Sequence, residues 1–180
     1  MNRRSFLSLP ALAPFSFIPL SFVHDRPDKG IRVDAGKDRF NKSFTYLGAR
    51  FDLKVSGKDT DGAMCIYDTL RFEKIGPPLH KHTNLDEWFF VMEGEFKVQI
   101  GQDIFRLKAG DSVLGPRGVA HTFVKTSDTV GRLLLIHQPA GTMEEYFAQV
   151  IQLKDPTPEQ KKALLVKHNM EAVGSALSPD

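Results

Sequence analysis

The chain has 180 residues, of which 41% are hydrophobic and 14 are phenylalanine, enough apolar side chains for the core of one domain. Its formal net charge is +2, and setting Arg3 and Arg4 aside from the 24 basic residues leaves 22, matched by 22 acidic residues. A neutral domain lacks the basic surface with which proteins bind nucleic acids. The single cysteine, Cys65, excludes an intrachain disulfide.

Residues 1–24 have the features of an export signal. The run Arg3–Leu7 fits the R-R-x-F-L pattern of the twin-arginine route, and an apolar stretch extends from it to Val23. Three prolines interrupt that stretch, so we expect no stable membrane span. The predicted location is the periplasm or another exported compartment. The alternative is a cytoplasmic protein whose apolar tail packs on the domain or on a partner subunit.

From Ser43 onward the chain reads as short strands separated by turns. The run 95–100 alternates apolar and polar side chains, as a strand with one buried face does. Many short strands at this spacing predict an all-β sandwich or barrel over residues 25–140. The predicted strands span residues 44–55, 64–72, 86–92, 95–100, 122–125 and 132–137.

A first group of candidate metal ligands lies near the middle of the chain. His80 and His82 alternate on an extended segment, so their side chains share a face. Glu87 follows His82 by five residues, which is the wrong parity for one unbroken strand. Residues 83–86 must therefore bend the chain, so that Glu87 enters the same site from a neighbouring strand.

A further histidine, His121, follows the turn Pro116–Gly118. Three imidazoles and one carboxylate form a ligand set that suits a divalent transition metal. We predict one such ion held by His80, His82, Glu87 and His121, with Fe, Mn, Ni, Cu and Zn all compatible with these ligands. Of the other histidines, we expect His24 and His168 to be solvated and His137 to lie in the core or at a strand edge.

The periodicity becomes helical after Gly141. Apolar residues between Met143 and Leu153 recur at helical spacing. Thr157, Pro158 and Gln160 then form the start of a second helix, because they supply an N-cap, a first-turn proline and a capping box. Residues 141–180 are therefore predicted to form a C-terminal helical extension that covers an open side of the barrel or another subunit.

Both ligand segments resemble the motifs of the cupin superfamily. The first motif, G-x5-H-x-H-x3,4-E-x6-G, is matched from His80 to Gly94, with Gly76 two residues closer to the first histidine than the pattern requires. The second motif, G-x5-P-x-G-x2-H-x3-N, is matched from Gly110 to His121, with Lys125 in place of the final asparagine. The chain is most similar in outline to small bacterial quercetin-dioxygenase-like cupins.

This resemblance implies a double-stranded β-helix, the jelly-roll barrel of cupins, and a homodimer. Parity then predicts the walls of a substrate pocket. A strand that turns Glu87 inward also turns Phe89 and Val91 inward, and the strand of His121 does the same for Val119 and Phe123.

The predicted activity follows from the resemblance and the apolar pocket. We expect a metal-dependent dioxygenase that uses O2 on a flavonol-like or other enolisable small molecule, with Glu87 as both ligand and proton acceptor. Two alternatives remain, since one fold hosts many functions. One is a metal-dependent isomerase, epimerase or lyase, and the other is a non-enzymatic protein that binds a small ligand.

Overall fold

The computed structural model describes residues 26–180, so the predicted export signal and His24 lie outside the described residues. Among the described residues, no helix has the length and apolar character that crossing a bilayer requires. The elements are β1 (Phe44–Tyr46), β2 (Ala49–Val55), a 3-10 helix (Gly57–Thr60), β3 (Cys65–Arg71), β4 (Pro78–His82), β5 (Asp86–Glu93), β6 (Glu95–Ile100), β7 (Asp103–Lys108), β8 (Ser112–Gly115), β9 (His121–Lys125), β10 (Gly131–Gln138), α1 (Met143–Val150), α2 (Pro158–Lys167) and β11 (Met170–Ala176).

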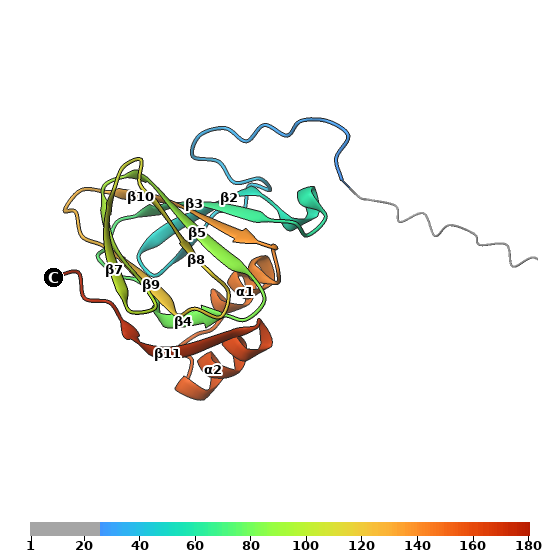
Figure 1. Ribbon diagram of the computed structural model, residues 1–180. Helices are drawn as coiled ribbons and strands as arrows, with labels where there is room; N and C mark the ends of the chain where they lie inside the picture. Colours follow the sequence, from blue (N-terminus) through green and yellow to red (C-terminus); the bar gives the residue numbers. More distant parts are fainter. Residues whose placement is uncertain (1–25) are drawn as a thin grey trace, which may run out of the picture.

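Two antiparallel sheets face each other and enclose the core (Figure 1). The six-stranded sheet has the order β1-β2-β3-β10-β5-β8, and the five-stranded sheet has the order β11-β4-β9-β6-β7. Consecutive strands often lie in different sheets or apart within one sheet, as a jelly roll requires. The predicted all-β jelly roll with C-terminal helices is confirmed.

The first predicted strand is interrupted. Residues 44–55 form β1 and β2 as a hairpin, because Leu47 and Gly48 adopt left-handed backbone conformations with φ of 47° and 62°. Glycine adopts a left-handed conformation readily, whereas a leucine in the sequence gives no indication of a turn. The reversal brings Phe44 opposite Phe51 and stacks their rings 5.0 Å apart.

The C-terminal segment differs from the helical extension predicted for residues 141–180. Asn169 has a φ of 60°, which ends the helical region, and residues 170–176 return to the barrel as β11. β11 pairs with β4, placing Met170 opposite His82 and Ala172 opposite His80. The second helix was expected to end at about Asn169, as α2 does, but the strand that follows was not predicted. The open edge of β4 offers the backbone hydrogen bonds that this strand uses.

The two helices cover one end of the barrel (Figure 1). Phe147 of α1 is buried, with its ring 5.1 Å from that of Phe51 and 5.0 Å from that of Tyr67. The predicted start of α2 is confirmed, since Thr157 and Gln160 form a capping box. The packing of Phe147 therefore places α1 on the barrel, which is one of the two positions predicted for this extension.

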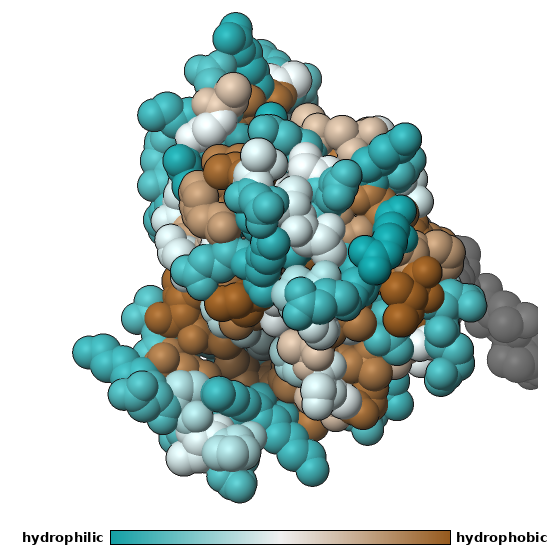
Figure 2. All heavy atoms as spheres, turned by 90° about the vertical axis from the view of Figure 1, so that its left-hand side faces the viewer, coloured by the Kyte–Doolittle hydropathy of each residue, from teal (hydrophilic) through white to brown (hydrophobic). Residues whose placement is uncertain are grey.

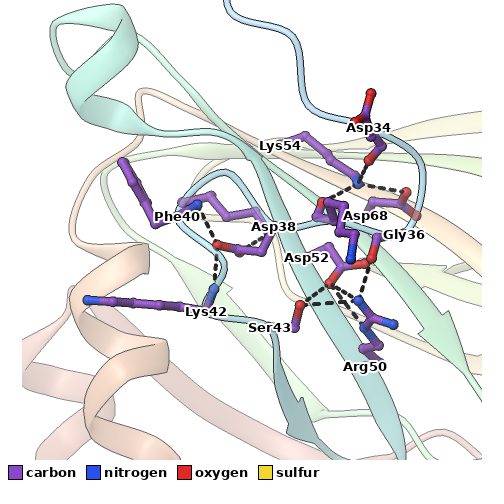
Figure 3. A network of polar contacts seen from close by, with 12 residues as sticks. Asp34, Gly36, Asp38, Phe40, Lys42, Ser43, Arg50, Asp52, Lys54 and Asp68 are labelled. Atoms are coloured by element: carbon purple, nitrogen blue, oxygen red, sulfur yellow. Dashed lines mark hydrogen bonds and ion pairs between the residues drawn. The ribbon is translucent and has the colours of Figure 1, made fainter.

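Hydrogen bonds to buried acidic side chains hold the segment before β1 against the six-stranded sheet (Figure 3). Asp38 accepts hydrogen bonds from the backbone N–H groups of Phe40, Lys42 and Leu53, at 2.7, 3.0 and 2.7 Å. Lys54 donates to the carbonyl oxygen of Lys37 at 2.6 Å. These contacts fix the chain beside β2 and so hold the β1–β2 hairpin over the barrel end.

Candidate metal centre

The four predicted ligand residues lie together inside the barrel. β4 supplies His80 and His82, β5 supplies Glu87, and β9 supplies His121. One potential ligand atom of each lies within 4.8 Å of those of the others, and all four side chains are buried. His80 and His121 are direct cross-strand partners, which explains how residues 41 positions apart in the chain become neighbours.

A polar link holds the two ligand segments in register. Asp86, at the start of β5, accepts hydrogen bonds from the backbone N–H of Arg117 at 2.8 Å and from its guanidinium at 3.1 and 2.7 Å. The N–H of Gly118 also donates to the carbonyl oxygen of His82 at 2.7 Å. The turn that precedes His121 is thus tied to both β4 and β5.

Backbone carbonyl groups fix the orientation of two imidazoles. The Nδ1 atoms of His80 and His121 lie 2.9 and 3.0 Å from the carbonyl oxygens of Pro78 and Val119. A carbonyl oxygen only accepts, so each Nδ1 carries the proton and each Nε2 faces the cluster, where Nε2 of His121 lies 3.1 Å from Oε2 of Glu87. This is the tautomer that a metal-binding histidine requires, with its other nitrogen held by an outer partner.

His82 gives a more direct indication of a missing partner. Both of its ring nitrogens are buried, and neither has a hydrogen-bond partner within residues 26–180. Its Nε2 atom lies 3.3 Å from Oε2 of Glu87 without the alignment of a hydrogen bond. Buried polar atoms are normally satisfied, and an ion shared with the neighbouring ligands would give one of these two nitrogens a partner.

Electrostatics keep His80, His82 and Glu87 in the protonation states that bind a metal. Burial and the nearby His121 and His82 lower the pKa of His80 to about 4, and burial lowers the pKa of His82. Burial alone would raise the pKa of Glu87, but His137, His121 and His82 hold it well below its usual range. Neutral imidazoles and an ionised carboxylate are the forms that bind a metal.

The residues fit a divalent transition metal. Such an ion binds imidazole nitrogen and carboxylate oxygen at roughly 2.0–2.2 Å, so opposite ligand atoms lie up to roughly 4.4 Å apart. The observed limit of 4.8 Å therefore requires little adjustment of the side chains.

A fifth polar residue, His137 of β10, touches the cluster. Its Nε2 atom lies 3.3 Å from Oε1 of Glu87, and its Nδ1 atom lies 3.7 Å from the sulfur of the buried Cys65. Burial would lower the pKa of His137, but the charge of Glu87 raises it to about 10. The sequence placed His137 in the core or at an edge, and its parity with Leu133 and Leu135 was the signal that it faces inward.

A cavity of about 580 Å³ opens beside the cluster, with His80, His82 and Glu87 among its lining residues. Apolar side chains also gather around a hollow in the lower half of the face drawn in Figure 2. The walls of the cavity are mainly apolar and aromatic, and include Tyr46, Phe51, Phe123, Leu135, Phe147 and Leu164.

Of the four predicted pocket residues, Phe123 lines this cavity, whereas Phe89, Val91 and Val119 do not. Parity placed Phe89 and Val91 correctly on the inner face, but they belong to the packed core. The ring of Phe89 contacts those of His121 and Phe123 at 5.8 and 5.5 Å. The cavity instead opens toward β1, β2 and the helices, which a strand-parity argument does not reveal.

Two further residues depart from expectation. His168 was predicted to be solvated but is buried, because its Nδ1 atom lies 2.9 Å from the Thr142 hydroxyl and its ring lies 5.8 Å from that of Tyr146. Lys125, which replaces the asparagine of the second motif, is buried and donates to the carbonyl oxygens of Ser127 and Thr129 at 3.0 and 2.7 Å. Lys125 therefore closes the loop after β9 and leaves the ligand cluster untouched.

Comparison with known proteins supports the resemblance to cupins seen in the sequence. Residues 72–137, which contain all four ligand residues, match the cupin domain family. The matched segment comprises 66 of the 180 residues and runs from the end of β3 to β10. No curated protein sequence matches the chain.

Solved structures to which this chain is similar include three bacterial proteins. A predicted oxalate decarboxylase from Thermotoga maritima shares 17% identity, with a TM-score of 0.50 over 54% of this chain and 90% of that one. KdgF from Halomonas sp. shares 16% identity, with a TM-score of 0.49 over 54% and 86%. An RmlC-like cupin from Shewanella frigidimarina shares 24% identity, with a TM-score of 0.47 over 55% and 84%. At 17% identity, the likeness to the Thermotoga maritima protein concerns the fold alone.

Proposed function

We propose that this cupin is a metal-dependent dioxygenase that acts on a flavonol-like or other enolisable small molecule. The observation that carries this proposal is the position of the buried His80, His82, Glu87 and His121 cluster against a cavity with apolar, aromatic walls. Such walls suit a flat aromatic substrate better than a highly hydroxylated sugar.

A bound divalent ion would supply a Lewis acid for substrate oxygens and, if redox-active, a site for O2 chemistry. His80, His82 and His121 would hold such an ion through imidazole nitrogens, together with the carboxylate of Glu87. Four protein ligands would leave positions on the ion for other molecules. The aromatic rings of Phe51 and Phe147 exclude water from the space where the substrate lies.

Glu87 is the candidate proton acceptor. Its Oε2 atom lies 3.1 Å from Nε2 of His121 and 3.3 Å from Nε2 of His82, while its Oε1 atom faces His137. The carboxylate accepts the hydroxyl proton of an enolisable substrate, which leaves the electron-rich enolate for attack on oxygen. His137 positions the carboxylate through the ion pair between its Nε2 atom and Oε1, at 3.3 Å.

An oxygen-electrode assay of metal-loaded protein with a flavonol tests this function. We expect O2 uptake that depends on the metal and is abolished in His80→Ala. The matched control is His168→Ala, which removes a buried histidine away from the cluster and should retain activity in the folded fraction. Turnover without O2 would favour an isomerase, epimerase or lyase, and recovery of unchanged ligand would favour a binding protein.

Export and assembly complete the proposal. We propose that residues 1–24 direct the chain to the periplasm by the twin-arginine route and that the mature domain is a homodimer. Cell fractionation of an Arg3→Lys, Arg4→Lys variant checks the first, and light scattering of the purified protein checks the second.

A further inference from the structure

Arg71 is a buried arginine in the wall of the cavity. It is the last residue of β3, shares the inner face of that strand with Tyr67 and Thr69, and is 2% exposed. Its guanidinium carbon lies 4.4 Å from the ring centre of Phe123 and 5.4 Å from that of Phe51. The charged group is thus held between two aromatic rings that also line the cavity.

Within residues 26–180 the guanidinium has no anionic partner. No side chain or backbone oxygen within residues 26–180 accepts a hydrogen bond from it, and its Nε atom is fully buried without a partner. By contrast, the less buried Arg39, Arg50, Arg117 and Arg132 each pair with an aspartate. A buried charge without a partner is costly, and aromatic rings replace only part of the lost hydration.

Arg71 remains a cation at neutral pH. Burial lowers its pKa to about 9, and the charge of Glu87 acts against that decrease. The charge therefore persists in the cavity, where a ligand oxygen can satisfy it. Among the described residues, the other non-histidine charges that line the cavity are those of Glu87 in the cluster and of Lys161 on the exposed side of α2. An anionic group that enters the cavity would therefore find its buried counter-charge at Arg71.

The cavity connects Arg71 with the cluster. Phe123, which contacts the guanidinium, lies two residues after the ligand His121 on β9. Arg71 and the ligand residues His80, His82 and Glu87 border the same space. One molecule can therefore contact the guanidinium at one end and reach the cluster at the other.

We propose that the substrate carries a carboxylate and that Arg71 is the residue that binds it. The planar guanidinium fork matches a carboxylate through two parallel hydrogen bonds. The aromatic walls then hold an apolar or aromatic body, and the enolisable oxygen lies at the cluster. The last of these roles rests on the proposed function, whereas recognition of the carboxylate rests on Arg71 alone.

Calorimetric titration of anaerobic, metal-loaded protein tests the proposal without turnover. The probes are phenylpyruvate, an enolisable aromatic carboxylate, and its uncharged methyl ester. We expect the wild-type protein to bind the acid at least about tenfold more tightly than the ester, as a charge-assisted bidentate contact predicts. Phenyl phosphate serves as a third probe, and tighter binding of phenyl phosphate than of phenylpyruvate would overturn the assignment of a carboxylate.

Variants of Arg71 test whether this residue causes the preference for the acid over the ester. Arg71→Met and Arg71→Gln should reduce the acid-to-ester preference to near unity, while Arg71→Lys should retain part of it. Arg106→Gln, at an exposed arginine of β7, is the matched control and should retain the full preference. Persistence of the preference in folded Arg71→Met protein would overturn the proposal. Equal binding of acid and ester by the wild type would also overturn it, without the need for any variant.

The same measurements separate this inference from the proposed function. If flavonols support O2 uptake but acid and ester bind equally, the dioxygenase assignment stands and the role of Arg71 fails. If Arg71 confers acid preference but no enolisable acid or flavonol supports O2 uptake, the carboxylate site stands and the dioxygenase assignment fails.

Discussion

Glu87 is the carboxylate that contacts three histidines of the site. Its carboxylate faces His82 and His121 through one oxygen and His137 through the other. The substitution Glu87→Gln retains the shape and removes the charge. We expect loss of turnover and a metal affinity at least about tenfold weaker, because the ligand set loses its only anion.

Elemental analysis measures the loss of bound metal. An NMR titration of His137 provides a second, independent measurement. The pKa of His137, raised to about 10 by Glu87, should fall in this variant. Glu159→Gln, at an exposed position on α2, is the matched control and should change neither quantity. Full metal content in Glu87→Gln would contradict its role as a ligand.

His137 is a positioning residue that acts through Glu87. We expect His137→Gln to weaken metal binding by about ten- to hundredfold, as loss of a group that orients a ligand does. Competition with a chelator of known affinity measures this effect. The control His168→Gln replaces a buried histidine bonded to Thr142 and should leave metal affinity unchanged. Equal effects of the two substitutions would mean that His137 only supports the fold.

Acid should destabilise the metal-free protein through His80. Burial, followed by the charges of His121 and His82, lowers the pKa of His80 to about 4 from an ordinary 6.5. The unfolded chain therefore binds this proton at higher pH than the folded chain, so the stabilisation is present above pH 6.5 and is lost as pH falls toward 4. We expect the Tm of chelator-treated protein to fall over this range and His80→Gln to reduce the slope. An identical slope in the variant would rule out this origin.

At the scale of elements, Gly76 allows its own segment to lie close to β9, the strand that carries the ligand His121. A Cβ atom at Gly76 would lie 1.7 Å from the carbonyl oxygen of Phe123, so the backbone would have to move. We expect Gly76→Ala to lower the free energy of unfolding by about 3 kcal/mol and to reduce metal content, because Phe123 and His121 share that strand. Denaturant unfolding checks the first, with Gly30→Ala, where a Cβ meets nothing within 4 Å, as the control. Equal stabilities of the two variants would contradict the close approach.

Most elements could be predicted because their signals are local. Alternation identified β6, and a capping box identified the start of α2. The hairpin at Leu47 could not be predicted, since a leucine with positive φ has no sequence signature. β11 was missed because its sequence, with Gly174 near its middle, is no strong strand former, and its pairing depends on the open edge of β4.

At the scale of the whole molecule, the ligand set could be predicted and its surroundings could not. His80, His82, Glu87 and His121 lie at motif spacing, so the sequence alone grouped them. His137 and Arg71 approach from β10 and β3, and only the closure of the barrel brings them near the same cavity. The walls contributed by β1, β2 and α1 were missed for the same reason, since they depend on how the helical segment packs on the barrel.

Elemental analysis of the purified protein, prepared without chelators, decides whether the buried cluster holds a metal. We expect about one divalent transition-metal ion per chain, lost in a His80→Ala, His121→Ala variant that remains folded. A wild-type protein that is metal-free, and that takes up none of Fe, Mn, Ni, Cu or Zn when each is offered, would contradict the metal centre and the chemistry proposed for it.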